Sequence, residues 1–229
     1  MAKIEHYYTR FENNGVYHIY NRTVDRKPMF TSDRNYHFFI RQFDKYLSGY
    51  IKIYAYCLLG NHFHFMIKVN DLTDLTTFEK LSNLDNENNL TTSKKLSNLE
   101  ESSQHKTTHN IISHQFKKFF QSYAMAFNKE QNRIGTLFQT PFKRVRVEDE
   151  NYLLELICYI NTNAQKHNLV KDFIEWKWSS YHNIISNKET KLLKGEVIRY
   201  FNDVENFKYC HLEYARKIDS VERDFFIED

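Results

Sequence analysis

Tyr54-Ala-Tyr-Cys-Leu-Leu-Gly-Asn-His-Phe-His-Phe-Met-Ile-Lys-Val69 is the stretch of sequence that decides the fold. Apolar and β-branched residues lie on both sides of the Gly60-Asn61 break, a pattern typical of two strands joined by a tight turn. Side chains alternate faces along a strand, so His62 and His64 are expected on one face of the sheet and Phe63 on the other. Two imidazoles about 7 Å apart along one strand can share a metal ion. An isolated His-x-His is also compatible with two exposed polar residues on an open sheet face, and this pattern alone does not decide between the two interpretations.

The rest of the chain predicts a recognisable order of elements. Helical spacing of apolar residues, strand alternation and turn residues give a strand, a helix, the hairpin, a helix, a strand and a further helix. These are expected at 16–23, 34–48 with Asp33 as the N-cap, 54–69, 112–127, 142–147 and 149–166. This order indicates an α+β fold with the ferredoxin-like βαββαβ arrangement, an antiparallel sheet with helices on one face and an additional C-terminal helix. Such a sheet has one face free to carry a site.

Composition excludes several classes of protein. The 229 residues are 41% apolar and 16% aromatic, enough for a sizeable core. No apolar run approaches the roughly 18 residues of a membrane span, and the first residues do not resemble a secretion signal. Cys57, Cys158 and Cys210 are far apart and odd in number, which argues against a disulfide framework and a Cys-based zinc site. We therefore expect a cytoplasmic protein without a membrane partner.

Residues 72–109 interrupt the pattern with a segment rich in Asn, Ser, Thr and Leu. Lys80-Leu-Ser-Asn-Leu84 recurs there as Lys95-Leu-Ser-Asn-Leu99, and we interpret the segment as a low-complexity insertion. The expected organisation is one domain from 1–71 and 110–185, this insertion, and a helical, acidic tail from 186–229. Without 72–109 and 201–229, 24 of the 32 Lys and Arg and 15 of the 29 Asp and Glu remain, a net charge of +9. A basic body of this kind suggests a polyanion as partner, although a merely basic domain would look similar.

The helix expected at 149–166 presents a tyrosine and an amide together. Its apolar stripe leaves Tyr159 and Asn163 one turn apart on a neighbouring face. A half-buried tyrosine with a hydrogen-bonded hydroxyl is the alternative, since helical spacing alone singles out none of the 16 tyrosines.

Five blocks of the sequence resemble, in order and spacing, those of the REP-associated tyrosine transposases. They are Tyr17-His-Ile-Tyr-Asn-Arg-Thr23, Ala55-Tyr-Cys-Leu-Leu-Gly-Asn-His-Phe-His64, Arg133-Ile-Gly-Thr-Leu-Phe-Gln139, Tyr152-Leu-Leu-Glu-Leu-Ile-Cys-Tyr-Ile160 and Trp178-Ser-Ser-Tyr181. These transposases are single-domain relatives of the HUH insertion-sequence transposases, whose hallmark is His-hydrophobe-His plus one catalytic tyrosine. The resemblance covers about residues 12–185 apart from the insertion.

The resemblance implies a metal-dependent nuclease and strand transferase acting on single-stranded DNA, with hairpin or palindromic sequences as targets. The positions matching the metal ligands are His62, His64 and Asn163, and the metal is Mg²⁺ or Mn²⁺. The catalytic tyrosine matches Tyr159, which would form a 5′-phosphotyrosine link. A phenol has a pKa near 10, so it needs deprotonation and a metal that polarises the phosphate to act as a nucleophile at neutral pH.

Two positions depart from the pattern of that family. Ala164 stands where the family has a proline, so the helix is expected to run on by several residues. Gln165 and water are alternatives to Asn163 as the third metal ligand. Gly60 also replaces a usual proline, and glycine suits the turn.

The contacts to DNA are expected from residues around the His pair. Lys143, Arg144 and Arg146 form a basic cluster on one strand, and Asn21 and Arg22 end the first strand, where a structural turn is an equal alternative. Trp176 and Trp178 either stack bases or pack the terminal segment against the body.

Three function classes follow. The first is the tyrosine transposase, the second a catalytically silent nucleic-acid-binding protein on the same fold, and the third a hydrolase in which the His pair activates water. The sequence does not decide between a monomer and a homodimer.

Overall fold

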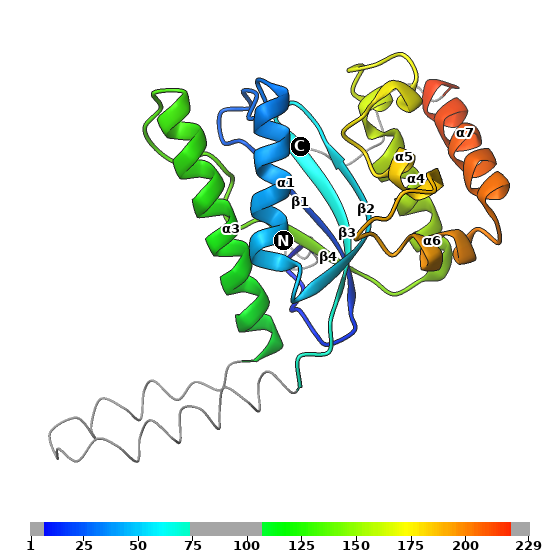
Figure 1. Cartoon of the computed structure of the whole chain (residues 1–229), viewed down its shortest axis with the longest axis horizontal. Coiled ribbons are helices and arrows are strands. Elements are labelled where there is room, and N and C mark those ends of the chain that lie inside the picture. Colours follow the sequence, from blue (N-terminus) through cyan, green and yellow to red (C-terminus); the bar gives the residue numbers. More distant parts are fainter. Residues whose placement is uncertain (1–6, 74–106, 221–229) are drawn as a thin grey trace, which may run out of the picture.

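The computed structural model describes residues 7–73 and 107–220, which form a four-stranded sheet with helices on both faces (Figure 1). The strand order is β2-β3-β1-β4, and all neighbouring strands are antiparallel. The strands are β1 (Val16–Arg22), β2 (Ile51–Leu58), β3 (His62–Val69) and β4 (Lys143–Val147). The expected α+β fold with a ferredoxin-like antiparallel sheet is therefore confirmed.

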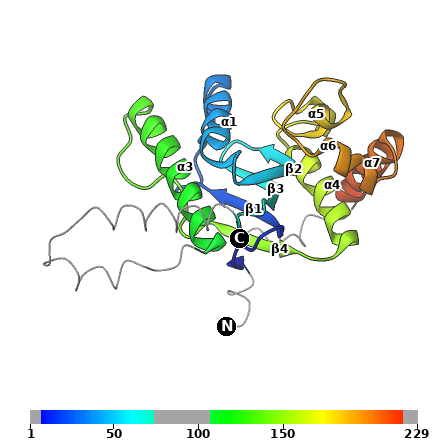
Figure 2. The ribbon, with the colours of Figure 1, turned by 60° about the horizontal axis from the view of Figure 1, so that its bottom comes forward.

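Two long helices cover one face of the sheet and the C-terminal helices cover the other (Figures 1 and 2). The first pair is α1 (Asp33–Leu47) and α3 (Thr108–Glu130), which pack against each other. The second group is α4 (Glu150–Lys166), the short helices η3 (Phe173–Glu175), α5 (Tyr181–Ile185) and α6 (Lys194–Tyr200), and α7 (Val204–Ser220). The additional helix that was expected to carry Tyr159, α4, thus lies on the face opposite α1 and α3, against β2 and β3.

Alternation along the strands divides the interior into two apolar clusters. Phe63 and Phe65 of β3 join the aromatic rings of α1 and α3, among them Phe39 and Phe119. Met66 belongs to the second cluster, which includes the apolar side of α4. Because side chains alternate, His62 and His64 share the α4 face with Met66.

The bounds of the helices follow their capping residues. The N-cap of α1 is Ser32, whose backbone is extended (φ −155°, ψ 160°), so the prediction of Asp33 as the cap was wrong by one residue. Asp33 instead lies in the first turn, where its carboxylate interacts favourably with the helix dipole, and its Oδ2 is 2.6 Å from Lys177 Nζ. In α4, Asp149 is the N-cap and accepts from the backbone N of Tyr152, and the helix continues past Ala164 as expected.

The two tryptophans pack the C-terminal segment against the body. Trp178 stacks on Tyr36 with 4.3 Å between ring centroids. Trp176 Nε1 donates to the backbone oxygen of Leu58 at 3.0 Å. The packing interpretation therefore holds, and neither ring is arranged as an open stacking platform.

The first two and last three residues of the expected insertion, 72–73 and 107–109, belong to the described structure. Leu72 is buried in the core, and Thr108 and His109 already belong to α3, so 72–109 was drawn too wide; residues 74–106 lie outside the described residues. Asn13 joins the two ends, because its Oδ1 accepts from Leu72 N at 3.3 Å and from Thr108 Oγ1 at 2.7 Å.

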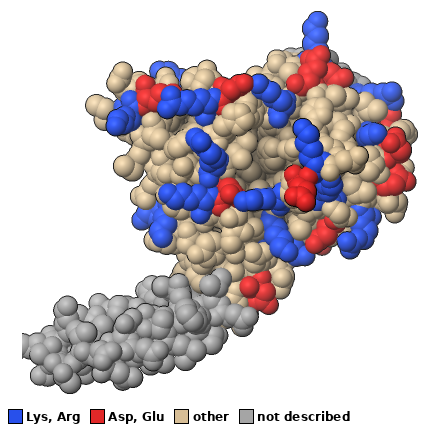
Figure 3. All heavy atoms as spheres, in the orientation of Figure 1, with Lys and Arg blue, Asp and Glu red and all other residues tan. Residues whose placement is uncertain are grey.

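The described part of the segment from 186 begins with a non-helical stretch over 186–193 and continues with α6 and α7, and α7 packs along α4. Residues 221–229 lie outside the described structure. On the face seen in Figure 3, Lys and Arg side chains are interspersed with Asp and Glu over the described part of the chain. On this face, the basic side chains expected from the sequence are therefore spread among acidic ones and do not form a single patch.

Candidate metal and tyrosine site

The His pair lies on β3 beneath α4. His62 is 9% exposed and His64 is 1% exposed, and their ring centroids are 5.4 Å apart with an interplanar angle of 85°. Arg22 and Tyr20 of β1 lie directly opposite them in the sheet. The two imidazoles are buried rather than exposed, which argues against the open-face interpretation.

Each imidazole is held through its Nδ1 atom. Asn61 Oδ1 lies 2.7 Å from His62 Nδ1, and His18 Nε2 lies 3.0 Å from His64 Nδ1. An amide oxygen only accepts, so the contact with Asn61 requires the proton of His62 on Nδ1 and leaves the lone pair on Nε2. Between His18 and His64, the tautomers of the two rings determine which nitrogen donates. Histidine ligands of metals are commonly oriented in this way by a partner on the second nitrogen.

His18 and Asn61 were not predicted as part of the site. Both stand in the quoted sequence blocks, but only the register of β1 against β3 brings His18 to His64. The signal that could have found Asn61 is its position in the turn directly before His62.

Tyr159 approaches the His pair from α4 of the same chain. Its ring centroid is 5.5 Å from that of His64 and 6.2 Å from that of His18, both edge-to-face. Lys166 Nζ is 4.8 Å from the Tyr159 ring centroid. The structure therefore brings together the two histidines and the tyrosine that the resemblance pointed to.

Asn163 is fully buried one turn beyond Tyr159. Neither polar atom of its side chain has a hydrogen-bond partner. Gln165 Oε1, the alternative ligand, accepts from the backbone N of Phe173 at 3.0 Å. Asn163 therefore suits the role of an oxygen ligand better than Gln165 does, and its assignment stays a prediction.

The donor set fits a divalent metal. The part of the chain that the structure describes contains no group of three or more His, Cys, Asp or Glu that could hold one. Two imidazoles would therefore need an amide oxygen, substrate oxygens or water to complete the coordination. Imidazole is a ligand of transition metals, whereas Mg²⁺ prefers oxygen alone, so the two histidines suit a transition-metal ion better than Mg²⁺.

The three basic residues of β4 are not one cluster beside the site, contrary to expectation. Lys143 pairs with Tyr20 on the face of the His pair, and its Nζ is 5.4 Å from the Tyr20 ring centroid. Arg144 faces the other way, donates from Nε to Thr9 O at 2.7 Å, and its guanidinium pKa is lowered by burial. Arg146 forms ion pairs with acidic neighbours, with 3.0 Å from its Nε to Glu148 Oε1.

The two residues at the end of β1 have different environments. Asn21 is 6% exposed, donates from Nδ2 to Gln139 O at 3.1 Å, and accepts from the backbone N of Arg22 at 2.9 Å. These contacts match the structural alternative. Arg22, across from His62, faces a pocket beside the His pair.

That pocket has a volume of about 300 Å³. It is lined by Tyr20, Asn21, Arg22, Arg26, His62, Phe63, His64, Gln139 and Lys143. Arg26 was not predicted as a site residue. A larger groove of about 750 Å³ lies between α1, β2 and residues 190–193, and it contains none of the site residues.

Comparison with known proteins supports the fold. No protein-family model and no curated protein sequence matches the chain. The fold is that of a tyrosine transposase structure: a REP-associated tyrosine transposase bound to a REP hairpin is similar with a TM-score of 0.53. The similarity covers 79% of this chain and 85% of that chain at 14% sequence identity, which shows a shared fold alone.

The resemblance is thus confirmed for the fold, and the roles of individual residues stay predictions. The described residues contain no helix that is both long and apolar enough to span a membrane.

Proposed function

We propose that this protein is a metal-dependent, single-stranded DNA transposase that cleaves and rejoins DNA through a 5′-phosphotyrosine intermediate. The observation that carries the proposal is the approach of Tyr159 to 5.5 Å from His64, measured between ring centroids, within one chain of transposase fold. The buried amide of Asn163, one helical turn beyond Tyr159, supports a metal site.

In the proposed reaction, the hydroxyl oxygen of Tyr159 attacks the scissile phosphorus. The new bond to the tyrosine oxygen forms as the bond from phosphorus to the 3′ oxygen breaks, and that oxygen leaves with a proton as a 3′-hydroxyl. The phosphodiester energy is conserved in the link, so a 3′-hydroxyl can later attack it and restore a DNA strand. No nucleotide cofactor is needed.

A divalent metal, Mn²⁺ or Mg²⁺, would be held by His62, His64 and Asn163 and would polarise the phosphate oxygens. The chain contributes the orientation of these ligands, since Asn61 and His18 fix the Nδ1 atoms of the two histidines. Lys166 contributes positive charge, because its Nζ at 4.8 Å from the Tyr159 ring attracts the phenolate that forms as the proton leaves.

The substrate proposed is a hairpin or palindromic single strand, in line with the hairpin bound to the similar structure. The tyrosine and both histidines come from one chain, so the proposed reaction needs no second copy. A homodimer would have to form through other surfaces.

The test is incubation with labelled hairpin DNAs taken from the genomic surroundings of the coding region, with Mn²⁺, followed by denaturing electrophoresis. We expect a protease-sensitive DNA band of reduced mobility with the unmodified protein and none with Tyr159→Phe. Tyr152→Phe is the matched control, because Tyr152 lies on the same helix and is 42% exposed. It should leave the adduct unchanged.

Two outcomes would replace the proposal. Cleavage by Tyr159→Phe without an adduct would assign the reaction to a water nucleophile. Tight binding without cleavage of any hairpin would indicate the catalytically silent binding protein.

A further inference from the structure

We propose that the pocket formed by Tyr20, Arg22, Arg26 and Lys143 holds one backbone phosphodiester of the DNA strand, beside the phosphate that reacts. This inference rests on single-stranded DNA as the substrate and extends it to a residue, Arg26, that no sequence block included. It assigns the pocket a ligand of definite chemistry, a single phosphodiester anion.

Charge is the first argument. Three cationic side chains line the pocket of about 300 Å³, and no Asp or Glu lines it. Among the described residues, no acidic side chain forms an ion pair with Arg22, Arg26 or Lys143. Uncompensated positive charge in a concave site attracts an anion.

Several other basic side chains of the described chain are paired with carboxylates, unlike the three that line the pocket. Arg133 Nη2 is 3.1 Å from Asp25 Oδ2, and Lys177 and Lys191 lie within 2.7 Å of carboxylate oxygens on α1. Arg146 pairs with Glu12 and Glu148. Fixed phosphate contacts are therefore expected from the pocket rather than from these residues.

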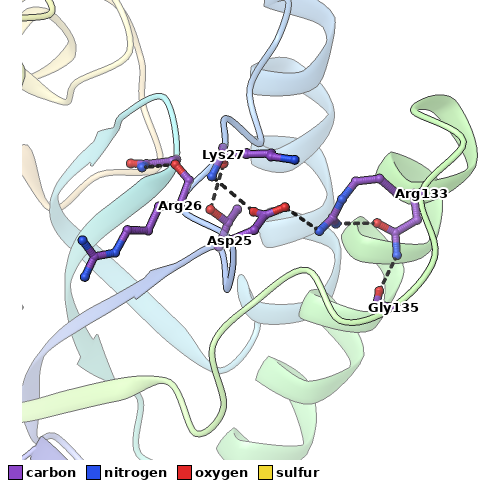
Figure 4. A network of polar contacts seen from close by, with 8 residues as sticks. Asp25, Arg26, Lys27, Arg133 and Gly135 are labelled. Carbon is purple, nitrogen blue, oxygen red and sulfur yellow. Dashed lines mark hydrogen bonds and ion pairs between the residues drawn. The ribbon is translucent and has the colours of Figure 1, made fainter.

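The backbone around Arg26 is built to aim its side chain. Arg26 has a positive φ of 58°, an uncommon conformation for a residue other than glycine. Asp25 holds the loop on one side through Arg133, whose Nη1 donates to Asn128 Oδ1 at 2.9 Å, and Asn128 Nδ2 donates to Gly135 O at 2.8 Å. Figure 4 shows the Arg26 side chain extending away from Arg133 and this network.

The same loop is joined to the metal site. Asn61 Nδ2 donates to the backbone oxygen of Arg26 at 2.7 Å, while Asn61 Oδ1 lies 2.7 Å from His62 Nδ1. One amide thus fixes both the ligand His62 and the backbone that carries Arg26. A phosphate in the pocket would therefore lie at a fixed position next to the His pair. Arg133, in the block from Arg133 to Gln139, would help to position the loop that carries Arg26.

The first experiment measures affinity for a labelled hairpin DNA against salt concentration by fluorescence anisotropy. All proteins carry Tyr159→Phe, so that binding is measured without reaction. We expect Arg26→Gln to weaken binding roughly 3- to 10-fold and to reduce the salt slope by about 1. Arg26→Lys should keep most of the slope, and Lys177→Gln, at an exposed pair with Asp33, should change neither quantity. Equal effects of Arg26→Gln and Lys177→Gln would overturn the proposal.

The second experiment identifies the phosphate. Each phosphodiester near the reacting one is replaced in turn by a neutral methylphosphonate. At one DNA position, we expect the methylphosphonate to weaken binding by the protein that keeps Arg26. The Arg26→Gln protein should bind this DNA and the unmodified DNA with equal affinity. Additive losses at every position would overturn the proposal, because no single phosphate would then depend on Arg26. Thermal unfolding of each variant establishes that it is folded.

The two proposals fail separately. If Tyr159 never forms an adduct but the methylphosphonate effect depends on Arg26, the transposase function is wrong and the phosphate pocket stands. If the adduct forms and Arg26→Gln has no effect on binding, only the pocket assignment is wrong.

Discussion

The side chain of Asn163 is buried without a hydrogen-bond partner among the described residues, and at the scale of single residues this is a stability cost that the proposed metal site would explain. A buried amide without partners costs about 1–3 kcal/mol. We therefore expect Asn163→Leu to raise the free energy of unfolding of the metal-free protein by about 1 kcal/mol, while it weakens Mn²⁺ binding. Urea unfolding in the presence of a chelator and calorimetric titration with Mn²⁺ measure the two effects.

The control for this prediction is Asn161→Leu on the same helix. Asn161 Oδ1 accepts from Ser180 Oγ at 2.6 Å, and its Nδ2 is 3.0 Å from His211 Nε2. Asn161→Leu removes both contacts and should lower the free energy of unfolding. A metal-free Asn163→Leu protein that is as destabilised as Asn161→Leu would contradict a ligand role for Asn163.

Strand alternation was enough to place His62 and His64 on one face, and the same two-residue spacing puts Arg144 and Arg146 of β4 on one face. Alternation alone could not predict which set of side chains in each strand lies on the α4 face of the sheet. Val147 packs in the cluster beneath α4, so the two arginines of β4 face the opposite side. The contacts of His18 and Asn61 could not be predicted either, because they depend on register and side-chain rotamers.

At the scale of elements, α7 docks on α4 through a buried histidine. His211 is fully buried on α7, its Nδ1 lies 2.7 Å from Phe207 O, and the Phe207 ring lies 4.0 Å from its own. The bounds of α4 were predictable from the Asp149 cap and the apolar period. The packing of α7 was not, because an amphipathic helix does not specify its partner.

The docking of α7 should weaken in acid. Burial lowers the pKa of His211 to about 4, against about 6.5 in an unfolded chain. Between these values the unfolded chain binds the proton and the folded chain does not, so stability is complete above pH 6.5 and falls as pH decreases to 4. The loss amounts to at most roughly 3 kcal/mol.

Urea unfolding at pH 7, 6 and 5 tests this dependence. His211→Gln should be less stable at pH 7 and should lose less stability on acidification than the unmodified protein. His114→Gln, at an exposed position on α3, is the control and should follow the unmodified protein. Parallel slopes for all three proteins would contradict the role of His211.

At the scale of the whole molecule, all four strands of the described sheet come from residues outside 74–106. Asn13 binds both ends of this segment, at Leu72 and Thr108. Replacing 74–106 with a Gly-Ser linker of about six residues, which spans up to roughly 20 Å, should leave the free energy of unfolding within about 2 kcal/mol of the full chain. Urea unfolding and the covalent capture of DNA measure the outcome, and a shortened chain that does not fold would refute it.

The overall topology could be predicted because each element had its own period and boundary residues. The insertion expected from composition stays a prediction, since 74–106 lie outside the described residues, while its expected limits reach into described structure. Leu72 packs in the core and Thr107 caps α3 by accepting from Asn110 N, and both look like parts of the polar segment in the sequence.

The division of the molecule by its sheet has an evolutionary consequence. The ring cluster on α1 and α3 has no contribution from Tyr159 or the His pair, so this part of the core does not depend on the residues of the proposed site. A mutation that removes the tyrosine hydroxyl leaves that cluster and the basic pocket in place. If the proposed function holds, a lineage could thus abandon DNA cleavage in a single step and retain a folded protein that natural selection can reuse.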